Sequence, residues 1–341
     1  MTVESDPEVH ATDYHTAGEP FRIVTAGVPE IPGATVRERR EHARRSSDVD
    51  GVRRLLCHEP RGHADMYGCF LVPPDDDGAH VGVLFWHKDG YSTACGHGTI
   101  AIGAWAVDTG RVAAAADGDT DVVIDVPSGR VTARVTRRDG RTERVIFRNV
   151  PAYVLARDLA LETSRGAVCV DVSYGGAIYA SVRASSVGLT VTPDCYSELI
   201  AVGREVKRAL DATDLARHPD DPRLSGVYGT VLYDDLGMTP EGPHQRNVTV
   251  FADGEVDRSP CGSGTSARLA LLAAAGRLTE GQVLIHDSIV GTRFLGRIAE
   301  RTTAAGRDAV VTEVAGNAFR TGEHVFVLDE RDSLGTGFVL R

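Results

Sequence analysis

The chain has 341 residues, of which 42% are hydrophobic and 25% are charged, as in an ordinary globular protein with room for two domains. Its 48 acidic residues outnumber the 37 lysines and arginines and give a net charge of -11, which disfavours nucleic acid as a partner because phosphates would be repelled. Residues 1–12 contain no apolar segment, and no stretch approaches the length that spans a bilayer. We therefore expect a cytoplasmic protein with no membrane partner.

The spacing of apolar residues predicts a regular order of strands and helices in the first half of the chain. The expected elements are a strand at 21–28, a charged helix at 35–47, a strand at 81–86, a helix at 98–108 and a β-meander over 122–150. The arginines of the charged helix are interleaved with acidic residues, so we expect that helix to present a solvated, ion-paired face.

The second half of the chain repeats this plan. The expected elements are strands at 167–172 and 177–182, a helix at 197–210, a strand at 247–251, a helix at 265–275, and strands at 289–298, 309–314 and 324–328. The repeat predicts an α/β protein of two lobes, each with antiparallel sheet wrapped around a central apolar helix. We expect an N-terminal lobe at 1–150, which the last strand of the chain joins, and a C-terminal lobe at 151–341.

The motif Cys-Gly-x-Gly-Thr occurs twice, at residues 95–99 and 261–265, and each copy opens one of the two apolar helices. A cysteine at a helix start lies near unpaired backbone N–H groups and the positive end of the helix dipole, which lower a thiol pKa. Because each half of the chain carries one copy, we expect Cys95 and Cys261 to face a shared cleft and to act as paired acid and base.

Backbone N–H groups at two such helix starts would bind a substrate carboxylate, and glycine allows close approach. The groups expected to do this belong to Gly96, His97, Gly262 and Ser263. A carboxylate held in this way acidifies the neighbouring α-hydrogen, because it accepts the negative charge that develops. One thiolate could remove that proton while the other thiol protonates the opposite face, which inverts Cα without a cofactor.

Four further side chains are candidates for the substrate pocket, although each has a structural alternative. Asp257 could pair with the substrate nitrogen or could simply form a turn. Tyr67, Phe85 and Phe251 could be walls that exclude water around a small ring, but such residues more often belong to the core.

The sequence gives no sign of a metal or nucleotide cofactor. Its six cysteines include no Cys-x-x-Cys pair, and Cys57, His58 and His63 lack a further ligand pair for zinc. No glycine-rich nucleotide motif follows a strand. We expect the four cysteines outside the repeated motif to be buried, inert thiols; they are Cys57, Cys69, Cys169 and Cys195.

Five segments together resemble the proline racemase family, which includes proline racemases, 4-hydroxyproline 2-epimerases and trans-3-hydroxy-L-proline dehydratases. They are Asp-Tyr-His-Thr-Ala-Gly-Glu-Pro at 13–20, Glu-Pro-Arg-Gly-His-Ala-Asp-Met-Tyr-Gly at 59–68, Gly-Tyr-Ser-Thr-Ala-Cys-Gly-His-Gly at 90–98, Ser-Tyr-Gly-Gly at 173–176 and Asp-Arg-Ser-Pro-Cys-Gly-Ser-Gly-Thr at 257–265. The resemblance implies a diaminopimelate-epimerase-like fold of two pseudo-symmetric lobes, cofactor independence and commonly a homodimer.

Carried onto this chain, the resemblance assigns the same roles as the chemistry above. It makes Cys95 and Cys261 the acid-base pair and assigns the carboxylate anchors, the nitrogen contact and the aromatic pocket to Gly96, His97, Gly262, Ser263, Asp257, Tyr67, Phe85 and Phe251.

The branch of the family is harder to predict. The segments around Tyr67 and Asp257 resemble the dehydratases, which typically carry threonine where this chain has Cys261. A second thiol favours inversion, and a phenol at Tyr67 could hydrogen-bond a hydroxylated ring. We rank proline racemase first, hydroxyproline epimerase second and trans-3-hydroxy-L-proline dehydratase third. A protein that only binds a small carboxylate is the non-enzymatic alternative, and it would need no thiol at either helix start.

Overall fold

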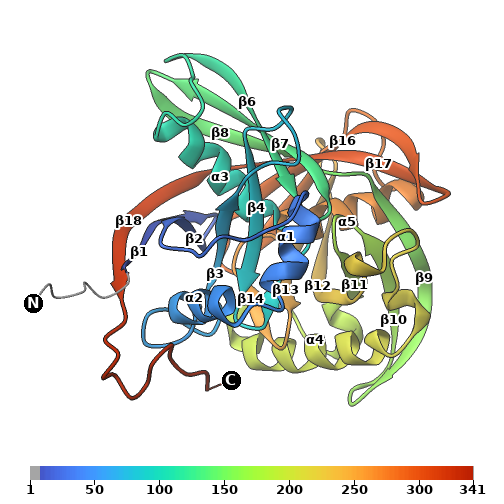
Figure 1. The fold of residues 1–341 in the computed structure, drawn as a ribbon. Coiled ribbons are helices and arrows are strands. Elements are labelled where there is room, and N and C mark those ends of the chain that lie inside the picture. The colour runs from blue at the N-terminus through green and yellow to red at the C-terminus, as the bar shows by residue number, and fades with distance from the viewer. Residues whose placement is uncertain (1–7, 341) are drawn as a thin grey trace, which may run out of the picture.

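The computed structural model describes residues 8–340 (Figure 1). The strands of the first half are β1 (Glu8–Thr16), β2 (Glu19–Ala26), β3 (Tyr67–Val72), β4 (Val81–His87), β5 (Gly90–Tyr91), β6 (Gly118–Val126), β7 (Gly129–Arg138) and β8 (Arg141–Arg148). The helices of this half are α1 (Val36–Ala43), α2 (Ser47–Cys57) and α3 (Gly96–Asp108).

In the second half, strands again outnumber helices. The strands are β9 (Ala152–Thr163), β10 (Gly166–Tyr174), β11 (Ile178–Arg183), β12 (Val227–Met238), β13 (Pro243–Phe251), β14 (Glu255–Asp257), β15 (Leu284–Ser288), β16 (Arg293–Ala304), β17 (Arg307–Gly316) and β18 (Ala318–Val327). The helices are α4 (Tyr196–Asp211) and α5 (Gly262–Ala274), with short 3-10 turns at Ala184–Val187, Pro193–Cys195, Asp214–Ala216 and Pro222–Leu224.

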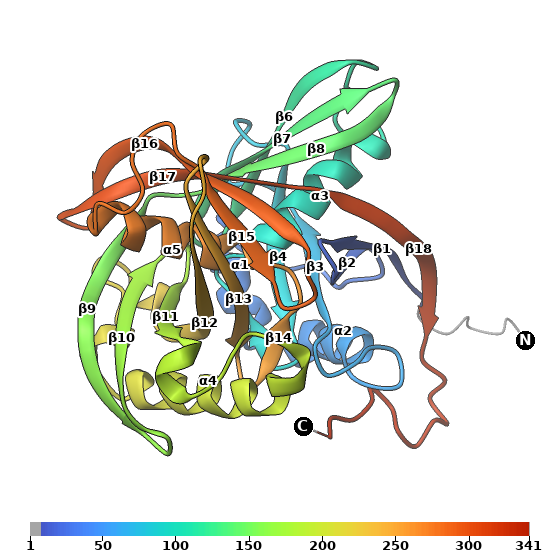
Figure 2. The same ribbon diagram turned by 180° about the vertical axis from the view of Figure 1, so that it is seen from behind.

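Helices α3 and α5 form the centres of two lobes. Nearly every residue of both helices is buried, as their apolar composition on all faces requires. Strands β1, β2, β6, β7, β8 and β18 contact α3, whereas β9, β10, β11, β16 and β17 contact α5 (Figures 1 and 2). The predicted α/β fold of two similar lobes, each with largely antiparallel sheet around a central helix, is confirmed.

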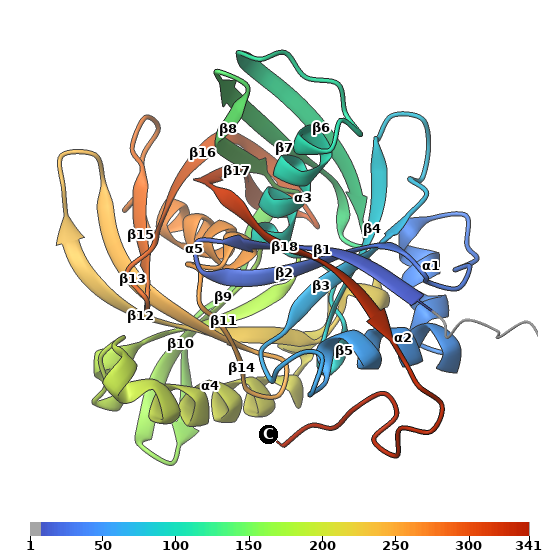
Figure 3. The same cartoon turned by 90° about the vertical axis from the view of Figure 1, so that its left-hand side faces the viewer.

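The last two strands tie the lobes together. Strand β17 pairs with both β8 and β9, and β18 then runs antiparallel to β1, so the end of the chain packs around α3. Figure 3 shows β18 beside β1 and β2, across the helix of the first lobe. The chain passes from β8 to β9 between residues 148 and 152, and a boundary at residue 150 stays a prediction.

The structure differs from the prediction at the charged helix of the first half. The expected single helix at 35–47 ends at Ala43, and Ser46 caps a second helix, α2, by accepting the Val49 N–H. Arg40 and Arg53 are buried rather than solvated, because their guanidinium groups donate to backbone carbonyls of the β4–β5 region. Periodic charge in the sequence did not distinguish these two arginines from exposed ones.

Another difference lies at 289–298, where we expected one strand. Strand β15 ends at Ser288 and β16 begins at Arg293, with a turn between them that contains Gly291 at φ 81°. A positive φ suits glycine and interrupts the extended backbone. Within the described residues, no helix is both long and apolar enough to cross a membrane.

Candidate active site

The starts of α3 and α5 meet backbone to backbone. A Cβ placed on Gly96 would lie 2.5 Å from Gly262 Cα, and one placed on Gly262 would lie 2.7 Å from Gly96 Cα. Only glycine permits such an approach. The two copies of the repeated motif, which lie 166 positions apart, are therefore neighbours at the junction of the lobes.

The two cysteines start their helices in different ways. Cys95 is an extended N-cap whose Sγ accepts the Gly98 N–H at 3.2 Å. Cys261 has φ 61°, a left-handed conformation that costs a non-glycine residue on the order of 1–3 kcal/mol. Its Sγ lies 3.8 Å from the Tyr179 hydroxyl. Both cysteines are only 4% exposed, so the two sulfur atoms are enclosed by the protein.

Burial raises the pKa of both thiols above the ordinary value, which for a free cysteine is about 8.5. The Gly98 N–H at Cys95 and the Gly264 N–H at Cys261 act in the opposite direction, while the charge of Asp257 adds to the increase at both. The expectation that the helix starts would lower these pKa values is wrong for the enclosed site, because desolvation outweighs the helix dipole. The negative charge of each sulfur also raises the pKa of neighbouring groups, and Cys261 contributes to the raised pKa of Cys95.

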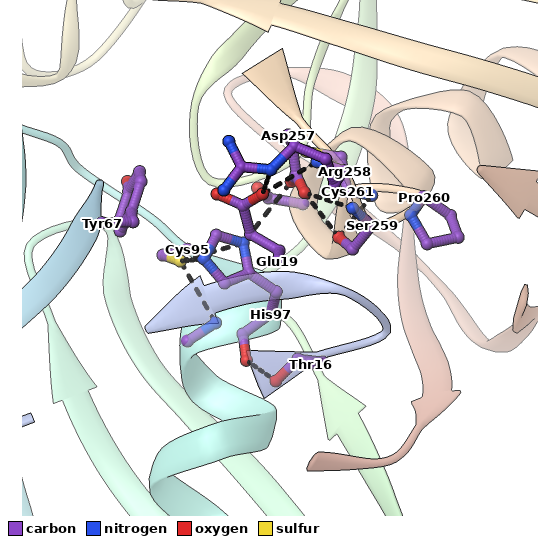
Figure 4. Close-up of polar contacts among 12 residues, drawn as sticks. Thr16, Glu19, Tyr67, Cys95, His97, Asp257, Arg258, Ser259, Pro260 and Cys261 are labelled. Atoms are coloured by element: carbon purple, nitrogen blue, oxygen red, sulfur yellow. Dashed lines mark hydrogen bonds and ion pairs between the residues drawn. The ribbon is translucent and has the colours of Figure 1, made fainter. Parts of the chain in front are cut away.

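His97 and Asp257 meet across the junction between the lobes. His97 Nδ1 lies 3.4 Å from Asp257 Oδ2, and both His97 ring nitrogens lie within 3.5 Å of Cys95 Sγ (Figure 4). Asp257 Oδ1 accepts hydrogen bonds from the Ser259 N–H and hydroxyl at 2.8 and 2.7 Å. Burial would raise the pKa of Asp257, but His97 and Ser259 outweigh it, so that pKa is lowered. An ionised carboxylate thus lies beside the thiols.

The predicted aromatic residues are not equivalent. The Tyr67 ring contacts His97 and Phe251, with centroids 5.0 and 5.6 Å away. Phe85 instead contacts Phe21, at 6.2 Å, and Phe21 in turn contacts Tyr67 and His97. The structure therefore brings Tyr67 and Phe251 together at the site, with Phe85 behind another ring.

Two tyrosines at the site were not predicted. The Tyr179 hydroxyl lies 2.7 Å from Ser263 Oγ, in addition to its contact with Cys261. The Tyr228 hydroxyl lies 2.9 Å from the Tyr67 hydroxyl, and the Tyr228 ring stacks on Phe251 at 5.5 Å. Tyr179 follows closely after the Ser-Tyr-Gly-Gly segment, which could have drawn attention to it, whereas nothing local marks Tyr228.

A hydroxyl cluster completes this wall of the site. Tyr67 OH also lies 2.5 Å from Ser92 Oγ, so Tyr67, Ser92 and Tyr228 share hydrogen bonds. A cavity of about 350 Å³ lies between the lobes and is lined by Ser92 and Tyr228, and by the cationic side chains of Arg204 and Lys207 on α4. Neither Cys95 nor Cys261 lines this cavity. The hydroxyl cluster therefore lies between the open cavity and the enclosed thiols.

The cysteines outside the motif differ in exposure. Cys57 and Cys69 are buried as expected, but Cys169 is exposed and Cys195 is partly exposed, which corrects the expectation for those two. Cys169 lies on β10, where side chains alternate between core and solvent.

One group in the described part of the chain could hold a metal ion. His87, Asp89 and Glu255 bring ligand atoms within 4.8 Å of one another. The Lys88 ammonium group lies 3.7 Å from Asp89 and 3.8 Å from Glu255, so a positive charge already balances these carboxylates. We read the group as an ion-pair cluster between the lobes.

The structure thus defines a protein of two similar lobes, with a cysteine at each of two abutting helix starts. A family model described as proline racemase matches residues 11–339, and the chain belongs to this family. The predicted family membership is therefore confirmed.

Relatives in the family have two kinds of activity. The chain is 42% identical to a trans-3-hydroxy-L-proline dehydratase of Bacillus cereus, over 96% of this chain and 97% of the relative. It is 44% identical to a 3-hydroxyproline 2-epimerase of Burkholderia multivorans, over 96% of this chain and 97% of the relative.

A solved structure of a hydroxyproline epimerase from Agrobacterium vitis, with trans-4-hydroxy-L-proline bound, matches with a TM-score of 0.91 and 32% identity. The match covers 98% of this chain and 95% of that one. The prediction of an enzyme of the isomerase or hydro-lyase type is confirmed. The expected homodimer, cytoplasmic location and absence of a cofactor stay predictions.

A pH prediction follows from the raised thiol pKa values. The two-thiol reaction predicted from the sequence needs one thiolate, so we expect kcat/KM to rise up to tenfold per pH unit from pH 6, with an acid limb above the ordinary thiol pKa. Ionisation of the second thiol should then cause a fall at higher pH. Steady-state kinetics from pH 6 to 10 would measure this, and a kcat/KM that is flat between pH 6 and 8 would contradict it.

Proposed function

We propose that the protein is a cofactor-independent 2-epimerase of hydroxyproline, which inverts Cα by proton transfer between Cys95 and Cys261. The observation that carries the proposal is the meeting of two cysteine-bearing helix starts beside an ionised Asp257. The names of the relatives favour hydroxyproline over proline, the substrate that the sequence ranked first. The hydroxyl cluster beside the aromatic wall supports the same choice, because it offers partners for a ring hydroxyl.

Substrate binding would use both ends of the amino acid. The carboxylate would accept hydrogen bonds from backbone N–H groups at the two helix starts, where the dipoles favour an anion. The ammonium group of the substrate would pair with Asp257. Its positive charge would also lower the pKa of a nearby thiol, which burial and Asp257 raise. Substrate binding thereby favours the thiolate that the reaction needs.

Inversion then needs two proton transfers. One cysteine, as the thiolate, removes the α-proton and becomes a thiol, and the electron pair of the broken C–H bond spreads into the bound carboxylate. The other cysteine, as the thiol, protonates Cα from the opposite face and becomes the thiolate. The two sulfur atoms have then exchanged roles, so the enzyme catalyses the reaction in both directions.

Proton NMR in D2O tests this function directly. We expect trans-3-hydroxy-L-proline or trans-4-hydroxy-L-proline to gain deuterium at Cα and to form the 2-epimer, faster than L-proline does. Exchange of none of the three compounds would contradict the proposal. Exchange of L-proline alone would return the substrate to the first choice from the sequence.

Dehydration of trans-3-hydroxy-L-proline is the second candidate, because relatives with that name reach 42% identity over nearly the whole chain. Here one thiolate would remove the α-proton, the electron pair of the broken C–H bond would form a Cα=Cβ double bond, and the β-hydroxyl would leave as water with a proton from the newly formed thiol. No proton donor on the opposite face of Cα is needed. The same NMR experiment distinguishes the two, since dehydration removes the Cβ proton signal beside the hydroxyl, whereas epimerisation retains it.

The Tyr67 hydroxyl provides a test of substrate choice. Tyr67→Phe keeps the ring beside His97 and Phe251 but removes a hydrogen-bonding group. One hydrogen bond contributes about 0.5–1.5 kcal/mol, so kcat/KM for the preferred hydroxyproline should fall roughly two- to tenfold while the value for proline changes little. An equal fall for both substrates would show that the hydroxyl does not recognise the ring.

A further inference from the structure

Both cysteines are enclosed where the two lobes meet, so a ligand reaches the sulfur atoms only when this enclosure opens. Contacts that cross between the lobes oppose such opening. One of these contacts reaches the turn that carries Asp257. It joins Arg258, on the C-terminal lobe, to two carboxylates of the N-terminal lobe, Glu19 and Asp65.

Glu19 holds Arg258 at two points. Its Oε2 accepts the Arg258 backbone N–H at 2.8 Å and lies 3.1 Å from Arg258 Nε. Asp65 adds a second pair of contacts: its Oδ2 lies 3.5 Å from Arg258 Nη1, and its Oδ1 accepts the Val256 N–H at 3.1 Å. Two carboxylates of one lobe thus hold residues 256–258 of the other, on both sides of Asp257. Figure 4 shows Glu19 against Arg258.

Burying the Glu19 carboxylate here costs free energy, because the group is removed from water. Its side chain is 0% exposed, and Oε1 has no hydrogen-bond partner among residues 8–340. A buried charge of this kind is stable only where its partner compensates for lost water. Burial raises the pKa of Glu19 well above its ordinary value, and Arg258, the leading influence in the opposite direction, offsets only part of this increase. Arg258 is therefore the main partner that stabilises the Glu19 carboxylate at this position.

We propose that Glu19 is a positioning residue for the reaction. By holding Arg258, with Asp65 beside it, Glu19 fixes the turn that presents Asp257 to His97 and couples closure of the lobes to assembly of the site. The inference rests on the proposed function for the role of Asp257. The sequence assigned no chemical role to the Asp-Tyr-His-Thr-Ala-Gly-Glu-Pro segment at 13–20. Glu19 gives this segment a role in positioning Asp257.

A second ion pair between the lobes supplies a matched control. Arg37 Nη1 lies 2.6 Å from Asp221 Oδ2, and neither residue contacts the turn at 256–259. Arg37→Gln therefore removes an ion pair between the lobes without touching the Asp257 turn.

The test compares Glu19→Gln, Arg258→Gln, the double variant and Arg37→Gln in two measurements. The first is the rate at which iodoacetamide alkylates Cys261 in the absence of substrate, mapped by mass spectrometry with exposed Cys169 as the internal reference. Cys261 is the diagnostic thiol, because the charge of Glu19 itself raises the pKa of Cys95 and its removal would speed alkylation there without any opening. The second is kcat/KM for Cα proton exchange.

We expect both single variants of the Glu19–Arg258 pair to raise Cys261 alkylation at least fivefold and to lower kcat/KM at least tenfold. The double variant should be within about twofold of the worse single variant, because the pair acts as a unit. Arg37→Gln should stay within twofold of the unmodified protein in both measurements. Unchanged Cys261 alkylation, an additive double variant, or an equal effect of Arg37→Gln would overturn the proposal.

Alkylation needs no turnover, so the role of the Glu19–Arg258 pair in holding the lobes together can be judged even if no hydroxyproline is exchanged. In that case the proposed function fails, while faster alkylation of Cys261 in the variants still supports this role of the pair. Should Glu19→Gln fail to fold, Arg258→Lys keeps the charge but cannot donate from both Nε and Nη1. Arg258→Lys should then give an intermediate rise in Cys261 alkylation and an intermediate fall in kcat/KM, and an unchanged value of both would overturn the proposal.

Discussion

Cys261→Ser is expected to lower the rate of Cα inversion by a factor of at least about 10³, because a positioned acid or base contributes on the order of 10²–10⁴-fold and a serine hydroxyl is a far weaker acid than a thiol. Removal of the α-proton on the Cys95 side should survive to a larger extent. Any dehydration of trans-3-hydroxy-L-proline, which would depend on Cys95, should therefore fall less than tenfold. Proton NMR in D2O measures both rates in one sample.

Cys169→Ser is the matched control for this change, because Cys169 is exposed on β10 and lies in neither copy of the repeated motif. It should leave both rates unchanged. Equal loss of inversion and dehydration in Cys261→Ser would mean that both thiols serve both reactions. Full retention of inversion would remove Cys261 from the acid-base pair.

The repeated motif explains why so much of the site could be predicted. Two copies of one helix-opening motif in two similar halves leave few arrangements other than facing helix starts, and the contact of Gly96 with Gly262 is the result. His97 lies within the first copy and Asp257 lies four positions before the second, and the two residues are brought to the same place. Local sequence determines helix starts and their glycines, and the duplication determines that they meet.

The remaining features depend on burial, which no local pattern reveals. The thiol pKa values depend on how completely the lobes enclose Cys95 and Cys261, and desolvation reversed the direction that the helix dipole alone would give. Tyr179 and Tyr228 lie at strand positions that read as ordinary core from their apolar neighbours. Glu19 was visible only as part of a family segment, because its partner Arg258 lies 239 positions away.

Burial also affects how the two thiols respond to substrate. In the enclosed site the raised pKa of both thiols favours their protonated form, and in the proposed mechanism the ammonium group of the substrate would supply the charge that favours a thiolate. We therefore expect the acid limb of kcat, which reports the substrate complex, to lie at lower pH than the acid limb of kcat/KM, which reports the free enzyme. Restricting the thiolate to the substrate complex would also protect it from oxidation between turnovers.

Gly96→Ala is expected to disrupt the site although alanine is the better helix former. Helix propensity alone would raise the free energy of unfolding of this variant by about 1 kcal/mol. The added Cβ would, however, lie 2.5 Å from Gly262 Cα and 2.6 Å from Ser263 N, and these are backbone atoms that cannot rotate away. Overpacking of this kind typically costs about 1–3 kcal/mol, and here it forces apart the two groups of N–H donors that would bind the carboxylate. We expect kcat/KM to fall at least about 10²-fold and the protein to lose stability.

Gly51→Ala separates crowding from helix propensity. Gly51 lies in α2, and no atom lies within 4 Å of a Cβ placed there, so the same substitution should stabilise the protein by about 0.5–1 kcal/mol and leave kcat/KM unchanged. Thermal unfolding and the exchange assay on both variants measure the contrast. If Gly96→Ala were as stable and active as Gly51→Ala, the two helix starts would not be in contact in the working enzyme, and a shared carboxylate site between them would have to be abandoned.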